Sequence, residues 1–289
     1  IKLLKKEKHH LLHTHQSKAG MIGRIAGKIV KVPVIFHTLH GPLFYKNQNI
    51  FLRNFYKFWE KILTKFTDCI ISVGKDLRDY YLKEKIGDPE KYVIVRSPVH
   101  LEKLEKFSKL SKEEKIKIKK ELKVEVDNPV VGWVGRMEKE KGVFIALEVA
   151  KKVIERCPSV NFLFVGKGPL LGKIKEKARE LNIEKNVKFL GFRKDIERVM
   201  AIFDILFSTS EREGLSQVLV QGAKLGIPIV SFDILGAKEM VKENGFLVPF
   251  ENISLMAEKI ISLLKDLKNA KILGEKGKKL VGREWELKE

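Results

Sequence analysis

Two cations stand five residues apart, at Arg136 and Lys141, in a segment that could hold a phosphate. An apolar run that ends at Gly135 precedes them and Gly142 follows them, a pattern typical of a buried strand, a turn and a helix start. Cations at the carboxyl end of a strand can converge on one phosphate without a metal ion. Isolated cations in so basic a chain are usually surface charge, but this spacing favours a phosphate site.

A second segment, 208–231, combines an acidic turn with a helix start. Glu213 and Gly214 follow an expected strand, and Ser216 is a favourable N-cap for a helix expected to run to Leu225. Unpaired N–H groups at a helix start favour an anion such as a diphosphate, and a nearby carboxylate can accept hydrogen bonds from sugar hydroxyls. Composition alone leaves open an ordinary turn with a solvated glutamate.

Two further turns follow expected strands. The first contains Gly166 and Lys167, and the second contains Phe192 and Arg193. Taken alone, a Gly-Lys-Gly turn is a common connection between a strand and a helix, and a single phenylalanine is usually a core residue. Both turns become informative only together with the two segments above.

Histidines gather at the ends of two expected strands near the amino terminus, at His13, His15, His37 and His40. A His-x-His pair can indicate a metal site, but no Asp, Glu or Cys stands near it at ligand spacing. We therefore expect no metal ion and no cofactor.

Together these segments resemble glycosyltransferase family 4, also called glycosyltransferase group 1, which has the GT-B fold. The family pattern Gly-Arg-x-x-x-x-Lys-Gly is complete at 135–142, and the Glu-Gly turn is followed by a helix and a Gly-x-Pro strand entry. The resemblance implies that Glu213 contacts the donor sugar, while the amides of Gly214, Leu215 and Ser216 hold sugar and phosphate oxygens.

The resemblance also assigns roles to the remaining residues. Gly166 and Lys167 would lie beneath the nucleotide, main-chain groups of Phe192 and Arg193 would read the base, and His40 would contact the donor sugar near the reacting centre. His13, His15 and His37 would lie at strand ends or behind the site. Arg136, Lys141 and Gly135 would bind the leaving nucleoside diphosphate.

The sequence departs from the family pattern at several points. Gln221 stands eight residues after Glu213, where the family has a second glutamate that binds the ribose hydroxyls, so a charge-assisted bond is lost. Pro98 stands where a glycine is usual. Relative to the family, the N-terminal strand, its Gly-rich loop and the C-terminal helix are missing.

Short β-branched runs alternate with helical segments, which predicts βα units on parallel sheets. The fold class is α/β, with two tandem Rossmann-like, doubly wound domains of GT-B type and an interdomain cleft. We expect a partial N-terminal acceptor-side domain over 1–104 and a C-terminal nucleotide-sugar-binding domain over 105–289. Residues 101–123 are expected to form a linker and a lead-in helix. The expected strands are 10–14, 32–37, 69–73, 92–95, 130–134, 161–165, 187–190, 204–207, 227–231 and 245–248; the expected first-domain helices are 18–30, 50–66 and 75–85.

The composition limits the classes of binding partner but does not identify one. The 289 residues have a formal net charge of +20, which would attract nucleic acid, an anionic membrane or phosphorylated substrates, or could simply be a solvated Lys-rich surface. No clustered basic stripe interleaved with aromatics is present, so nucleic acid is not expected. The two cysteines indicate neither a disulfide framework nor a zinc site. No long apolar run exists, so we expect a cytoplasmic protein, with membrane contact through the aromatic segment 50–59 left open.

The resemblance and the motifs predict a retaining hexosyltransferase of EC class 2.4. It would move a sugar from a UDP- or GDP-sugar to a lipid-linked or saccharide acceptor in the synthesis of cell-surface glycans or glycolipids. One alternative is a catalytically inactive GT-B scaffold or partner subunit, which Gln221 and the missing segments favour. A nucleotide-sugar epimerase of the same fold would require a different set of acidic and histidine residues.

Overall fold

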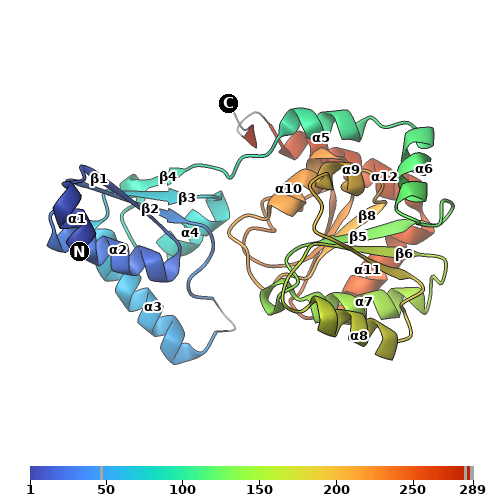
Figure 1. The fold of residues 1–289 in the computed structure, drawn as a ribbon, viewed down its shortest axis with the longest axis horizontal. Helices are drawn as coiled ribbons and strands as arrows, with labels where there is room; N and C mark the ends of the chain where they lie inside the picture. The colour runs from blue at the N-terminus through green and yellow to red at the C-terminus, as the bar shows by residue number, and fades with distance from the viewer. Residues whose placement is uncertain (46–47, 283–284, 287–289) are drawn as a thin grey trace. The chain divides into compact units, whose positions relative to one another are not determined.

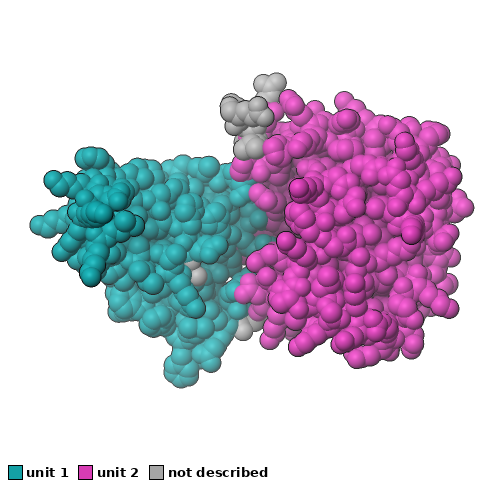
Figure 2. All heavy atoms as spheres, viewed as in Figure 1, with its two compact units in different colours: residues 1–97, 212–215 teal, residues 98–211, 216–289 magenta. Residues whose placement is uncertain are grey.

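The computed structural model describes residues 1–45, 48–282 and 285–286. The chain folds into two compact units (Figure 2), one of Ile1–Ser97 with Arg212–Leu215 and one of Pro98–Glu211 with Ser216–Glu289. The division along the chain falls between Ser97 and Pro98, whereas the predicted domain boundary between 104 and 105 stays a prediction.

The first unit is built on a four-stranded sheet in which all strands are parallel and follow the order β1-β2-β3-β4 (Figure 1). The β-branched runs form these strands about where the sequence predicts them, with bounds that differ by up to two residues. The elements of this unit are α1 (Lys2–Glu7), β1 (Leu11–His15), α2 (Ser17–Ile29), β2 (Val34–Leu39), α3 (Ile50–Leu63), η1 (Thr64–Phe66), β3 (Cys69–Ser72), α4 (Lys75–Lys83), η2 (Pro89–Lys91) and β4 (Tyr92–Ile94).

The helix predicted over 50–66 ends earlier than expected. α3 stops at Leu63, and the last three residues form the 3₁₀ turn η1. The Thr64 hydroxyl donates to the carbonyl of Lys61 and the Thr67 hydroxyl donates to that of Leu63. Threonine hydroxyls that bond nearby carbonyls compete with continued α-helix, which accounts for the shorter helix.

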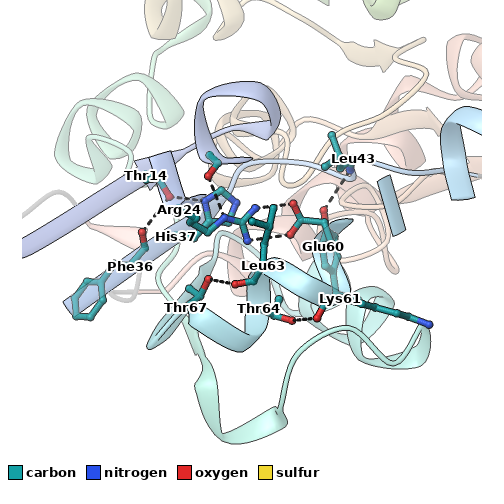
Figure 3. A network of polar contacts seen from close by, with 12 residues as sticks. Thr14, Arg24, Phe36, His37, Leu43, Glu60, Lys61, Leu63, Thr64 and Thr67 are labelled. Atoms are coloured by element: carbon teal, nitrogen blue, oxygen red, sulfur yellow. Dashed lines mark hydrogen bonds and ion pairs between the residues drawn. The ribbon is translucent and has the colours of Figure 1, made fainter. Parts of the chain in front are cut away.

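A fully buried ion pair joins α2 to α3. Arg24 Nη2 lies 2.6 Å from Glu60 Oε1 and Arg24 Nη1 lies 3.1 Å from Glu60 Oε2, with both side chains almost completely buried. Figure 3 shows the two planar groups facing each other, with Arg24 Nε also donating to the carbonyl of Gly20. Bidentate geometry of this kind fixes how the two helices meet, a feature that helical periodicity did not predict.

The second unit is built on a six-stranded parallel sheet in the order β10-β9-β8-β5-β6-β7. Strands β6 and β9 are buried along their whole length, and β5 and β8 are buried at all but their last residue, as expected for strands covered on both faces. The elements are β5 (Val130–Val134), η3 (Lys139–Lys141), α7 (Val143–Ile154), β6 (Asn161–Val165), α8 (Leu171–Glu180), β7 (Val187–Gly191), α9 (Ile196–Met200), β8 (Ile205–Ser208), α10 (Gln217–Lys224), β9 (Ile229–Phe232), β10 (Gly245–Val248), α11 (Ile253–Lys265), α12 (Leu267–Glu275) and η4 (Lys276–Leu280).

The segment predicted as a linker with one lead-in helix forms two helices, α5 (Leu101–Ser108) and α6 (Lys112–Glu121). Ser111 and Glu114 form a capping box that starts α6, and the buried Leu104 and Ile118 anchor the helices. A few buried leucine and isoleucine side chains with a good cap therefore suffice to order this Lys-rich segment. Among the described residues, no helix is both long enough and apolar enough to cross a membrane.

Candidate active site

Backbone contacts hold three turns together at the carboxyl edge of the second sheet. The Gly166 N–H donates to the carbonyl of Gly191 at 2.8 Å, and the Met137 N–H donates to that of Lys167 at 3.0 Å. Gly166 has φ 139°, and a Cβ there would lie 1.8 Å from the Gly135 carbonyl oxygen. Only glycine fits this close approach, so the turn that holds Gly166 and Lys167 lies directly against Gly135.

Thr209 ties the end of β8 to the start of α7. Its buried hydroxyl lies 3.0 Å from the carbonyl oxygens of both Lys141 and Gly142 and accepts from Trp133 Nε1 at 3.0 Å. A Cβ on Gly142, which has φ 64°, would lie 2.1 Å from the Thr209 carbonyl oxygen. The sequence analysis missed Trp133 and Thr209. Trp133 itself was a usable signal, because a tryptophan in a buried strand needs a hydrogen-bond acceptor for its indole N–H.

The cations Arg136 and Lys141 both lie on the turn between β5 and α7. The Arg136 side chain is 68% exposed and lies 3.2 Å from Glu138 at the nearest pair of charged atoms, while Lys141 is half-buried. The N-cap of α7 is Gly142, which has no side chain to occupy the amides of the first turn. Exposed positive charge beside a helix start suits an anionic group.

The acidic turn leads into α10 as expected, but its cap differs from the prediction. Ser216 is the N-cap residue, yet its side chain makes no capping hydrogen bond. Its ψ of 105° contrasts with the 167° of Ser111, whose hydroxyl does cap a helix, so the Ser216 backbone does not adopt the same capping geometry. Glu213 is half-buried, and it belongs with Gly214 and Leu215 to the first unit. Gln221 lies half-buried on α10.

Phe192 is an exposed aromatic side chain and not a core residue. It is 62% exposed, and the Lys167 ammonium lies 5.3 Å from the centroid of its ring. Arg193 forms a bidentate pair with Asp195 at 2.8 and 2.7 Å, and this hydrogen bond lowers the pKa of Asp195. The guanidinium of Arg193 is therefore already engaged, which leaves its main chain for the predicted contact with a base.

The histidines of the first unit divide between the two faces of its sheet. His15 Nδ1 lies 2.9 Å from His40 Nε2, and the rings stack with centroids 5.2 Å apart. His13 lies beside His15, with centroids 4.2 Å apart. His37 is buried instead, where its ring contacts Thr14 and packs close to Gly20.

Burial is the largest cause that lowers the pKa of His13, His37 and His40. Burial is the main cause that lowers the pKa of His40, followed by the charges of His15 and His13. Burial also lowers the pKa of His37 to about 3, with Arg24 as the next cause. In residues 1–45, 48–282 and 285–286, no group of three or more His, Cys, Asp or Glu side chains could hold a metal ion.

Family models match both parts of the chain. The model for "Glycosyl transferases group 1" matches residues 114–280, and the model for "Glycosyltransferase Family 4" matches residues 1–103. Similar proteins include the UDP-Gal:alpha-D-GlcNAc-diphosphoundecaprenol alpha-1,3-galactosyltransferase of Escherichia coli, 31% identical over 92% of this chain and 69% of that protein. The capsular polysaccharide biosynthesis glycosyltransferase CapM of Staphylococcus aureus is 26% identical over 97% of this chain and 74% of its own length.

Solved structures share the fold at lower identity. Anabaena HepE in complex with UDP superposes with a TM-score of 0.80 at 22% identity, covering 99% of this chain and 76% of that one. A glycosyltransferase from Rickettsia africae gives a TM-score of 0.76 at 24% identity over 99% of this chain and 75% of that one. Two parallel-sheet α/β units with these neighbours confirm the predicted GT-B fold. The chain therefore belongs to glycosyltransferase family 4, with a group 1 glycosyltransferase domain, and is a transferase of EC class 2.4.

Proposed function

We propose that the protein transfers a sugar from a UDP-sugar to a lipid-linked or saccharide acceptor in the synthesis of a cell-surface polysaccharide, with retention of anomeric configuration. The names of the relatives support this assignment, because the Escherichia coli protein uses UDP-Gal and a diphosphoundecaprenol acceptor and the Staphylococcus aureus protein serves capsular polysaccharide synthesis. GDP-sugars are the competing donor class and form one arm of the test.

The observation that carries the proposal is the organised carboxyl edge of the second sheet. Thr209 holds the Lys141–Gly142 turn against the end of β8, and Arg136 stands exposed on the same turn. Positive charge fixed in advance stabilises a leaving nucleoside diphosphate without reorganisation during the reaction. The site needs no metal in this proposal, since Arg136, Lys141 and the starts of α7 and α10 supply the neutralising charge.

The remaining roles are proposed from the family resemblance. Glu213 orients the donor sugar, Gly214, Leu215 and Ser216 supply amides, and His40 contacts the sugar near the reacting carbon. The lowered pKa of His40 favours the neutral imidazole, which can both donate and accept a hydrogen bond and so suits this role. Gln221 offers an amide where the family has a carboxylate, so we expect weaker ribose binding and not its loss.

Donor turnover by the purified chain tests the proposal directly. UDP-Gal, UDP-Glc, UDP-GlcNAc and GDP-Man are each incubated with the chain, and released nucleoside diphosphate is measured with and without a diphosphoundecaprenol-linked acceptor. We expect selective release from one UDP-sugar, stimulated by acceptor and reduced in Arg136→Ala. Nucleotide binding without any turnover would instead support the inactive scaffold.

The acceptor proposal includes contact with an anionic membrane through α3. The first nine residues of this helix contain no buried residue, and the aromatic face formed by Phe51, Leu52, Phe55 and Phe58 is exposed, with Phe51 82% exposed. α3 packs chiefly against α2 and leaves this face uncovered within the first unit. An amphipathic helix with bulky aromatics on one face is typical of helices that lie in a membrane interface.

The charge around α3 complements an anionic surface. The first 67 residues contain 13 lysines and arginines but only two carboxylates, Glu7 and Glu60. Glu60 is buried and paired with Arg24, so α3 presents no exposed carboxylate. Each Lys or Arg near an anionic leaflet contributes about 1 kcal/mol of attraction, and this adds to aromatic insertion.

Flotation with vesicles tests this contact. The wild-type chain should float with vesicles of phosphatidylglycerol and phosphatidylcholine and much less with phosphatidylcholine alone. Phe51→Ser/Phe55→Ser should abolish flotation, while Ile272→Ser, which removes an exposed apolar residue from α12 in the second unit, serves as the matched control. Equal flotation of all three proteins would remove the membrane contact from the proposal.

A further inference from the structure

A hollow lies in the second unit, at the opposite edge of the sheet from the turns described above. Its volume is about 480 Å³, and it opens at the amino ends of β8 and β9, next to Asp204 and Pro228. Its walls come from the connection between α5 and α6 and from α12, on the side of the unit marked by the labels α6 and α12 in Figure 1. A cavity of this size accommodates a small molecule.

Four lysines from separate segments line this hollow: Lys109, Lys115, Lys268 and Lys271. In the part of the chain that the structure describes, none of the four forms an ion pair with a carboxylate. The two carboxylates of the lining are already engaged. Asp204 accepts a hydrogen bond from the Val130 N–H at 2.7 Å, and Glu275 pairs with Lys278 at 2.7 Å. Positive charge is therefore in excess around the cavity.

Lys115 shows that these charges act on one another. It is half-buried on α6, and burial is the first cause that lowers its pKa. Lys271, Lys278 and Lys119 lower the pKa further by repulsion, while Asp204 opposes them. A bound anion would relieve this repulsion and raise the pKa of Lys115 again.

Four apolar residues of the lining are buried and are called the floor of the hollow below: Phe203, Leu225, Ile227 and Pro228. Lys115 is half-buried, so it interacts with an anion more strongly than a fully solvated lysine would, because less water screens its charge. The floor also offers contact area for the organic part of a ligand.

We propose that this hollow is a second anion site that binds a phosphorylated small molecule with an apolar or aromatic moiety. The lysines bind the phosphate, and the floor formed by Phe203, Leu225, Ile227 and Pro228 contacts the organic part. The site is separate from Arg136 and Lys141, and it does not depend on the proposed transferase chemistry.

Calorimetric titration with phenyl phosphate and with inorganic phosphate tests the proposal. It is carried out in physiological salt on an Arg136→Ala/Lys141→Ala background, so that binding at the donor edge cannot account for the signal. We expect phenyl phosphate to bind, and to bind more tightly than inorganic phosphate because of the apolar floor. If inorganic phosphate bound as tightly as phenyl phosphate, the inferred contact between the floor and an organic group would be overturned.

Matched charge variants locate the binding. Lys115→Gln/Lys271→Gln should weaken phenyl phosphate binding about tenfold or more. Lys120→Gln/Lys265→Gln removes two exposed lysines outside the lining and should change it less than about twofold, because distant charges are screened. Equal weakening in both variants, or no binding to the background protein, would overturn the proposal; unchanged thermal midpoints verify that each variant is folded.

Discussion

The carboxyl edges of the two sheets are organised by different kinds of contact. In the second unit, glycines let backbone meet backbone, as where the Gly166 turn closes on Gly135, and one buried threonine hydroxyl fixes the next turn. In the first unit the same edge carries stacked, hydrogen-bonded histidine rings. The comparison indicates that the second edge is preorganised for a rigid anion, whereas the first depends on contacts between imidazole side chains.

The largest effect is expected from a substitution that fills the closest backbone contact at the carboxyl edge of the second sheet. Gly166→Ala places a Cβ where only 1.8 Å separates it from the Gly135 carbonyl, at a φ of 139°. We expect a loss of about 4 kcal/mol or more in the free energy of unfolding, or failure to fold. Gly172→Ala in α8, where a Cβ meets nothing within 4 Å, should leave stability equal or raise it by about 0.5–1 kcal/mol. Denaturant unfolding measures both, and similar midpoints for the two variants would contradict the account.

The first unit has one rigid polar element of its own, the Arg24–Glu60 pair. Arg24→Met leaves the Glu60 carboxylate buried without its partner and should cost about 3–5 kcal/mol in the free energy of unfolding. The double variant Arg24→Met/Glu60→Met should recover most of this loss, because no buried charge remains. If the double variant were as unstable as the single one, packing and not charge would explain the effect.

Removing the exposed cation of the second edge should affect binding and not stability. Arg136→Ala should weaken UDP binding by about tenfold to a hundredfold, the effect of losing a charge-assisted contact. Arg179→Ala, on the exposed surface of α8, is the matched control and should bind UDP like the wild type. Calorimetric titration compares the three proteins, and unchanged affinity in Arg136→Ala would remove this residue from the site.

The first unit should instead show a pH dependence through its buried histidine, His37. His37 has a pKa of about 3 in the folded state and 6.5 in the unfolded chain. Between these two values the histidine is protonated in the unfolded chain but not in the folded protein. Stability is thus lost as the pH falls from 6.5 towards 3, by about 1.4 kcal/mol per pH unit. His37→Gln should flatten this limb of the stability profile, while His9→Gln, at an exposed position, should not. An equally steep limb in His37→Gln would assign the acid sensitivity to other groups.

Much of the second unit follows from its sequence. Strands β5, β6 and β10 have the predicted bounds, because each is a short run rich in apolar residues. The positions of Arg136, Gly166 and Phe192 at turns were also predictable. The hydroxyl of Thr209 and the indole N–H of Trp133 were not, because each finds its partner 67 or more residues away.

Other features of both units were harder to predict in detail. The start of α6 in the second unit depends on a capping box, and the early end of α3 in the first unit depends on threonine hydroxyls, which act against simple periodicity. His37 and His40 have the same residue type and a spacing of three, yet one is buried under α2 and the other is exposed. Which histidine faces which side depends on the strand register and on Gly20, whose lack of a side chain makes room for the ring.

The central claim, that the second unit binds the diphosphate of a UDP-sugar donor, is tested most directly by thermal unfolding of the chain with UDP, GDP and ADP. A ligand that binds only the native state raises the midpoint once its concentration exceeds its dissociation constant. The account predicts a concentration-dependent rise with UDP that is larger than with GDP or ADP and is lost in Arg136→Ala/Lys141→Ala. No rise with any nucleotide, or an equal rise in the double variant, would contradict it.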